Sequence, residues 1–397
     1  MPRSSARRNV FILALCQALA MTGNNILATT SSLVGYSLVV DKSWATLPAA
    51  VQMTGTMLAI IPASLLMARV GRRAGFTFGA VVGTTGAGLA TLAIFRASFA
   101  LFCTGTCLLG AYAGFAAYYR FAAAETADPA FRGKAISLVM AGGVASALFG
   151  PELAKWSRGL FDPVLFAGCY LIILAMCSAA IVLVQLVAIP RLVLAADAAS
   201  RPLRQIMRQP AFISAAVAGM IAYGTMSLLM TATPLAMVAC ALPFEDAAFV
   251  IQFHALGMYA PSFFTGSLID RFGALKVMLC GVALFVLCAV IALSGVHLAQ
   301  FWAALMLLGT GWNFLFIGST ALLTQTYKPA ERAKTQAAND FLIFGTVAVS
   351  AFSSGVLLAG YGWAMLAFLV LPLAAIILGF LLFYRRHRIL ALAVASR

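Results

Sequence analysis

A few ionisable side chains inside long apolar stretches are the residues of this chain most able to do chemistry. Asp340 and Glu152 each lie about one helical turn inside such a stretch, and His254 lies deeper, sixteen residues before Asp270. An ionised group is costly in an apolar interior, and histidine changes charge near neutral pH. The pattern predicts that His254, Asp340 and Glu152 take part in proton coupling. The alternatives are a packing role for His254 and a local ion pair of Glu152 with Lys155.

Arg120 is a cation in an apolar stretch that also carries aromatic hydroxyls. It directly follows Tyr118 and Tyr119 and lies eight residues after Tyr112. A cation in this setting predicts binding of an anionic group of a substrate. The alternative is a long side chain that extends to water at the end of the stretch.

Uncharged polar and aromatic residues occur near the middle of several apolar stretches. Amides, aromatic rings and methionines suit a moderately apolar organic solute better than a sugar or a metal ion. Hydrogen bonding between helices is the competing interpretation. The residues predicted to bind substrate are Asn24, Asn25, Gln52, Tyr112, Tyr119, Arg120, Tyr223, Trp312 and Asn313.

The composition places these residues in a membrane protein. Of the 397 residues, 63% are hydrophobic and 9% are charged, and the mean hydropathy is +1.01. A soluble globule could not present a water-compatible surface with this composition. The net charge of +15 does not indicate nucleic-acid binding, because Lys and Arg occur in short clusters between apolar runs.

The apolar runs predict the elements that position the candidate residues. About 20 apolar residues make one membrane crossing, so the chain is predicted to be an all-α integral membrane protein with twelve transmembrane helices. The predicted spans are 9–39, 46–69, 76–96, 99–125, 134–156, 163–189, 210–240, 246–270, 274–296, 299–326, 336–360 and 362–384.

The distribution of positive charge predicts the orientation of these spans. By this layout 21 of the 26 Lys and Arg residues lie on the side of the termini, four lie on the other side, and one is within a span. Positive loops stay cytoplasmic, so both termini are predicted to be cytoplasmic, in a bacterial inner (plasma) membrane. The longest polar connection predicts a division into residues 1–190, a linker 191–209 and residues 210–397.

Two short basic loops recur at nearly one spacing. The loop SLLMARVGRRAG around Arg69 matches GSLIDRFGALK around Arg271, and PAFRGK at 129–134 matches PAERAK at 329–334. Two repeated motifs at nearly the same spacing indicate an internal duplication into six-helix halves.

The stretch 266–273 fits GxLxDRxG, which resembles the signature loop of major facilitator superfamily transporters. The resemblance implies two pseudo-symmetric six-helix halves that transport by alternating access, with this loop latching the halves. The first copy departs from it at Ser64 and Ala68. The residues implied in gating are Arg69, Gly71, Arg72, Arg73, Gly266, Asp270, Arg271 and Gly273.

The fifth predicted span is similar to the antiporter motif of exporters in this family, through Gly142, Gly150 and Pro151. Close helix packing explains the same residues. The first hypothesis is therefore a secondary transporter for proton-coupled efflux of drug-like or metabolite compounds. The alternative is an uptake carrier for a small organic anion, and a third class is a membrane receptor or scaffold.

Enzyme chemistry is not indicated by the sequence. It contains no GxxxxGK phosphate loop, no HExxH and no nucleophile elbow. The eight cysteines lie in apolar stretches without CxxC spacing, so they predict neither disulfides nor a metal site. We expect a monomer in the lipid bilayer that carries a small molecule, with protons as the coupling ion, and without a cofactor or nucleic acid.

Overall fold

The computed structural model of the protein describes residues 3–126, 132–187, 189 and 201–395. Within these residues the regular structure consists of α-helices and two short 3-10 helices, without a strand. Ten helical stretches of the described chain are long and apolar enough to cross a membrane. The all-α fold class predicted from the apolar runs is confirmed. The contacts divide the chain into two compact units.

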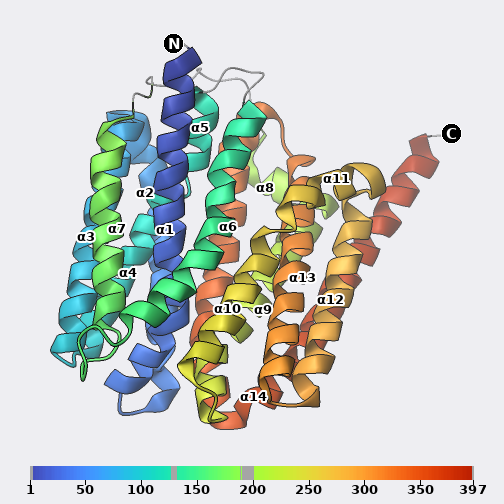
Figure 1. The fold of residues 1–397 in the computed structure, drawn as a ribbon. Coiled ribbons are helices and arrows are strands. Elements are labelled where there is room, and N and C mark those ends of the chain that lie inside the picture. The colour runs from blue at the N-terminus through green and yellow to red at the C-terminus, as the bar shows by residue number, and fades with distance from the viewer. Residues whose placement is uncertain (1–2, 127–131, 188, 190–200, 396–397) are drawn as a thin grey trace. The chain divides into compact units, whose positions relative to one another are not determined.

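The first unit comprises Met1–Leu194 and Ala241–Gln252. Within it α1 packs along α6, and α3 packs between α4 and α7 (Figure 1). Buried Phe76, Phe102 and Tyr170 belong to its apolar core. Its helices are α1 (Arg3–Leu38), η1 (Lys42–Trp44), α2 (Leu47–Val70), α3 (Arg72–Phe95), α4 (Phe99–Ala116), α5 (Tyr119–Thr126), α6 (Arg132–Ser157) and α7 (Ala167–Gln185).

Glycines bring α2 and α4 into backbone contact. A Cβ atom added to Gly110 would lie 1.8 Å from the Gln52 carbonyl oxygen, and one added to Gly55 would lie 2.2 Å from that of Cys107. Helices in a membrane associate through such small residues, because lipid offers little apolar driving force for helix association. This close approach fixes the position of Gln52, one of the predicted substrate ligands.

The second unit comprises Ala195–Cys240 and Phe253–Arg397, so α10 contributes its first part to one unit and its last part to the other. Within it α9 packs along α14, and α12 packs along α13 (Figure 1). The remaining helices are α8 (Leu203–Met207), α9 (Pro210–Ala239), α10 (Phe244–Tyr259), α11 (Ser262–Phe272), α12 (Ala274–Ser294), α13 (Leu298–Thr324), η2 (Pro329–Glu331) and α14 (Arg332–Ala395).

Every predicted span coincides with a helix, part of a helix or two successive helices, and two details differ from the prediction. The span 99–125 is interrupted between α4 and α5, and the span 246–270 between α10 and α11, where Pro261 cannot continue the backbone hydrogen bonds. The last two spans share the label α14, but non-helical backbone at Gly362, where φ is +74°, divides it into two helical parts, which agrees with the predicted boundary between residues 360 and 362.

The two matching loops have the same backbone geometry. Gly71 separates α2 from α3 with φ of +93°, and Gly273 separates α11 from α12 with φ of +85°. Side chains other than glycine rarely adopt this region, so each loop needs its glycine to turn directly from one helix into the next. The equivalence of the loops inferred from the sequence therefore extends to their conformation.

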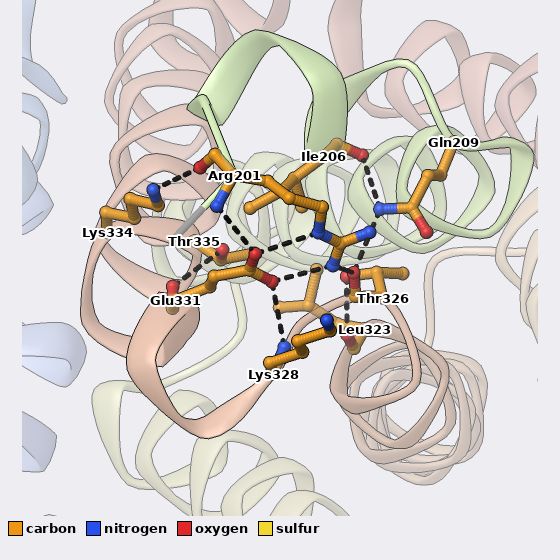
Figure 2. Close-up of polar contacts among 9 residues, drawn as sticks. All are labelled: Arg201, Ile206, Gln209, Leu323, Thr326, Lys328, Glu331, Lys334 and Thr335. Carbon is orange, nitrogen blue, oxygen red and sulfur yellow. Dashed lines mark hydrogen bonds and ion pairs between the residues drawn. The ribbon is translucent and has the colours of Figure 1, made fainter. Parts of the chain in front are cut away.

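An ion pair ties the start of the second unit to the segment just before α14. Figure 2 shows the Arg201 guanidinium facing the Glu331 carboxylate, with Nη2–Oε2 at 2.6 Å and Nε–Oε1 at 2.8 Å. The backbone N–H of Arg201 donates to Oε1 and that of Lys328 donates to Oε2, both at 2.9 Å. The Glu331 side chain is 1% exposed, so its charge is compensated by these donors in a buried site.

Further hydrogen bonds extend this Arg201–Glu331 clamp. Arg201 Nη2 also donates to the Thr326 carbonyl at 3.0 Å, and Gln209 Nε2 donates to the same carbonyl at 2.9 Å. Lys334 Nζ donates to the Arg201 carbonyl. The clamp thus holds the residues that lead into α9 against the end of α13 and the start of α14 (Figure 2).

We expect Glu331→Gln to lower the melting temperature of the detergent-solubilised protein by several degrees, because Arg201 would lose its counter-ion. The Arg201 guanidinium and the Lys328 N–H hold the pKa of the Glu331 carboxyl well below its usual range. A lowered folded pKa stabilises the fold fully above the unfolded value of about 4.3, and this contribution is lost as the pH falls through the folded pKa. The difference between wild type and variant should therefore be constant from about pH 6 to 8 and shrink below about pH 4.

Glu152→Gln is the matched control, since Glu152 is 53% exposed and pairs with Lys155 in a local contact. Exposed pairs contribute little to stability. A melting temperature that responds equally to both substitutions would contradict a stabilising role of the clamp.

Candidate functional site

Two amide pairs connect three helices of the first unit. Gln52 Nε2 on α2 donates to Asn24 Oδ1 on α1 at 3.2 Å, and Asn25 Nδ2 on α1 donates to Ser146 Oγ on α6 at 3.0 Å. Gly150 lies directly against Asn25, since a Cβ atom on Gly150 would be 2.6 Å from the Asn25 Cβ. The structure brings together predicted substrate ligands and the glycine of the fifth-span motif. Within each pair the two side chains hydrogen-bond to each other across two helices, which is the bonding between helices considered from the sequence.

A small cavity beside the first amide pair joins Asn24 to Tyr112. Its volume is about 10 Å³, roughly the space for one water molecule. An organic solute does not fit in this space, so the cavity by itself is no substrate site. Its lining consists of Leu19, Ala20, Gly23, Asn24, Leu27, Leu109, Tyr112, Ile173, Met176 and Cys177.

The other predicted residues of the first unit do not line this cavity. Tyr119 is fully buried against Phe76, with ring centroids 4.5 Å apart. Arg120 follows in the first turn of α5, half-buried, with its guanidinium 4.8 Å from the centroid of the Phe121 ring. Gly142 packs against the backbone of Ala18 on α1, and Pro151 lies inside α6.

The second unit carries an aromatic cluster formed by Tyr223 of α9, Trp312 and Phe316 of α13, and Phe344 of α14. Trp312 and Phe316 stack with centroids 4.9 Å apart and planes 10° apart, and Tyr223 meets both rings edge-on at 5.2 and 5.5 Å. Phe344 lies 5.8 Å from Tyr223. The Trp312 Nε1–H is buried and has no hydrogen-bond partner within the described chain. This cluster combines flat apolar faces with a donor that is free to bind.

Asn313, the neighbour of Trp312, is engaged in the break between α10 and α11. Its Nδ2 donates to the Met258 carbonyl at 2.6 Å and to Ser262 Oγ at 2.7 Å, and Thr265 Oγ1 lies 2.6 Å from its Oδ1. Both amide hydrogens are therefore used within the unit. The bond to the Met258 carbonyl gives a partner to a backbone acceptor at the break, and the other two bonds go to side chains of α11, which supports a positioning role for Asn313.

His254 is fully buried on α10 and links this helix to α13. Its Nδ1 lies 2.8 Å from the Leu305 carbonyl, so Nδ1 carries the proton in the neutral ring. Its Nε2 is buried without a partner among the described residues. Nδ1 thus orients the ring, and Nε2 can accept a proton.

The other acids predicted in coupling lie in less buried surroundings. Glu152 Oε1 lies 2.5 Å from Lys155 Nζ, the local pair that the sequence left as an alternative. Asp340 is half-buried in α14, where Asn339 Nδ2 lies 3.2 Å from its Oδ1. Among the described residues there is no group of three or more His, Cys, Asp or Glu side chains that could hold a metal ion.

The residues of the two basic loops make different contacts. Arg73 donates from Nε and Nη2 to Gln185 Oε1 at 3.2 and 3.0 Å, and Arg72 Nη1 lies 3.3 Å from the Met67 sulfur. In the second copy the Arg271 guanidinium lies 5.2 Å from the Phe272 ring centroid. The exposed residues are Arg69 and Arg73 in the first loop and Gly266, Asp270, Arg271 and Gly273 in the second.

A family model for the Major Facilitator Superfamily matches residues 13–259 and 215–392. The chain belongs to this superfamily. The resemblance inferred from the loop 266–273 is thereby confirmed, and so is the expectation of a transporter of small solutes that is not an enzyme.

Relatives within the superfamily match nearly the whole chain. The riboflavin transporter RfnT of Brucella anthropi is 42% identical, over 94% of this chain and 95% of that protein. The uncharacterized MFS-type transporter YdeG of Bacillus subtilis is 29% identical, over 92% and 89%. A crystal structure of the nucleoside transporter NupG matches with a TM-score of 0.71 at 13% identity, covering 94% of this chain and 99% of that one. The fold of this integral membrane protein is that of its superfamily.

Two residues of the structure's most extensive polar contact, Arg201 and Glu331, were not among the predicted functional residues. A signal existed in the sequence, because Glu331 stands in the repeated PAERAK, where the first copy has Phe131. An acid that appears in only one copy of a duplication indicates a contact present in only one half. Phe131 itself lies outside the described residues.

We expect Asn313→Leu to destabilise the protein by about 1–3 kcal/mol, because the buried Met258 carbonyl and the buried Thr265 hydroxyl at the α10–α11 break would lose their partner. Thermal unfolding in detergent measures this effect. Thr320→Val is the control on the same helix, since the exposed Thr320 hydroxyl bonds only to the Phe316 carbonyl one turn earlier. Unchanged stability combined with lost substrate binding would instead support the direct binding role predicted from the sequence.

Proposed function

We propose that this protein is a secondary transporter of riboflavin or a closely related planar heteroaromatic compound. The observation that carries the proposal is the 42% identity to a riboflavin transporter over 94% of the chain. An identity of this level across both halves makes a shared substrate class a reasonable inference. Riboflavin is an uncharged, flat tricyclic ring with carbonyl acceptors and a hydroxylated side chain.

The aromatic cluster of the second unit supports this substrate class. The stacked Trp312 and Phe316, with Tyr223 edge-on to both, are suited to a flat ring by size and apolarity. The unpartnered Trp312 Nε1–H can donate to a ring carbonyl. The first unit by itself carries amide and hydroxyl groups in the Asn24–Gln52 and Asn25–Ser146 pairs, and such groups can hydrogen-bond to a hydroxylated solute.

We propose uptake as the direction, because a vitamin is a nutrient that cells acquire from outside. Export is the second candidate, favoured by the Gly142, Gly150 and Pro151 pattern that resembles the antiporter motif. Expression in a riboflavin-auxotrophic bacterium without its own carrier distinguishes the two. Uptake restores growth at low external riboflavin, whereas export lowers the internal riboflavin content.

The orientation belongs to the same proposal. The excess of Lys and Arg in the loops on the side of the termini supports cytoplasmic termini in a bacterial inner membrane. A reporter enzyme that is active only in the periplasm should be inactive when fused to the C-terminus, and activity there would contradict this orientation.

We expect Trp312→Leu to weaken riboflavin binding by about tenfold, since ring stacking contributes about 1–3 kcal/mol and 1.4 kcal/mol corresponds to a factor of ten. Quenching of riboflavin fluorescence by the purified protein measures the affinity. Trp302→Leu is the matched control on the same helix, because Trp302 is 37% exposed and pairs with Phe253, away from the cluster. Equal losses in the two variants would contradict a binding role for Trp312.

Proton coupling in our proposal is carried by His254. We expect His254→Gln to flatten the dependence of transport on pH below about 6.5, because imidazole is the side chain whose charge changes near this pH. Uptake into proteoliposomes with and without an imposed pH gradient is the measurement, and His297→Gln, at an exposed position, is the control. A wild-type pH profile in His254→Gln would return His254 to a packing role and direct attention to Asp340.

A further inference from the structure

A cavity of about 200 Å³ lies at the end of the second unit where α11 turns into α12. The ends of α13 and α14 complete it. One wall is apolar. The polar residues are Gln325, which directly follows α13, and Tyr384 and Arg388 of α14. The lining residues are Ile269, Gly273, Ala274, Leu275, Met278, Ala321, Leu322, Gln325, Tyr384 and Arg388.

The first unit closes the corresponding position with hydrogen bonds. Arg73 at the start of α3 donates to Gln185 at the end of α7, and Gln185 Nε2 donates to Thr77 Oγ1 at 2.8 Å. In the aligned loop of the second copy Leu275 replaces Arg73, and the same offset places Leu279 at the position of Thr77. The same side-chain contact cannot form in the second copy, where the cavity lies instead.

The polar groups of the cavity are uncompensated. Gln325, Tyr384 and Arg388 make no side-chain hydrogen bond or ion pair with any described residue. No acid lines the cavity, although Asp270 follows Ile269 in the chain. The lining therefore carries a net positive charge and favours an anionic ligand.

The surface around the cavity is apolar and exposed. Phe272 and Leu382 are each 47% exposed, and Phe383 is 42% exposed. On α14, Leu382 and Phe383 are followed within one turn by the exposed basic residues Arg385 and Arg386. Aromatic and basic residues together at the end of a transmembrane bundle are typical of the membrane–water interface, where anionic lipids bind in basic pockets between helices.

We propose that this cavity binds an anionic phospholipid. The lipid phosphate pairs with the Arg388 guanidinium and accepts hydrogen bonds from Tyr384 and Gln325. An acyl chain lies along the apolar wall of Leu275 and Met278. A lipid is favoured over free phosphate because the lining includes the apolar side chains of Ile269, Leu275, Met278 and Leu322, which an inorganic ion would leave unused. The bound lipid would take the place of the side-chain tie that holds α3 to α7 in the first unit.

Reconstitution into nanodiscs tests the proposal. We expect an equimolar mixture of phosphatidylcholine and phosphatidylglycerol to raise the melting temperature by several degrees over phosphatidylcholine alone, and native mass spectrometry to retain bound phosphatidylglycerol. Arg388→Gln should remove at least half of the shift and of the retained lipid. Arg386→Gln, an exposed basic residue of the same helix outside the cavity lining, should keep both.

A second variant tests whether the melting-temperature shift depends on the cavity or only on the charge of Arg388. Leu275→Trp fills the cavity and leaves every charge in place, so it should also lose the shift and the retained lipid. Equal shifts in wild type, Arg388→Gln and Leu275→Trp would overturn the proposal. It would also be overturned if inorganic phosphate, added to the protein in an uncharged detergent, reproduced the stabilisation.

Discussion

Polar groups inside an apolar bundle must find partners within the protein, and the rest of this structure depends on that constraint. At the break between α10 and α11, Asn313 of α13 donates to the Met258 carbonyl and to the Ser262 hydroxyl. Buried Glu331 persists because Arg201 and two backbone N–H groups surround its carboxylate. These contacts hold the helices in the positions from which they present the candidate substrate residues.

The two copies of the duplication meet this constraint with different residues. The first uses Arg73 and Gln185 to tie α3 to α7, while the second has Leu275 and a cavity at that place. The second copy instead carries Glu331, where the first has Phe131, and builds the clamp with Arg201. A duplicated fold is thus preserved by helix packing, while its polar ties diverge between copies.

The candidate substrate groups are also divided between the units. Amides dominate in the first, through Asn24, Asn25 and Gln52, whereas stacked aromatic rings dominate in the second, through Tyr223 and Trp312. Each set by itself agrees better with an organic solute than with a small ion.

The sequence by itself determined the class, the helices and the two equivalent loops, because hydrophobic run length and glycine at a sharp turn are local properties. It also predicted the alternative pair of Glu152 with Lys155, which lie within one turn of a helix. Only the tertiary structure decided the partners of the remaining polar residues. Arg201 and Glu331 are 130 residues apart in the chain, and Asn313 lies 48 residues from Thr265. Such contacts depend on which helix faces meet, and the pattern of one segment contains no information about the face that its distant neighbour presents.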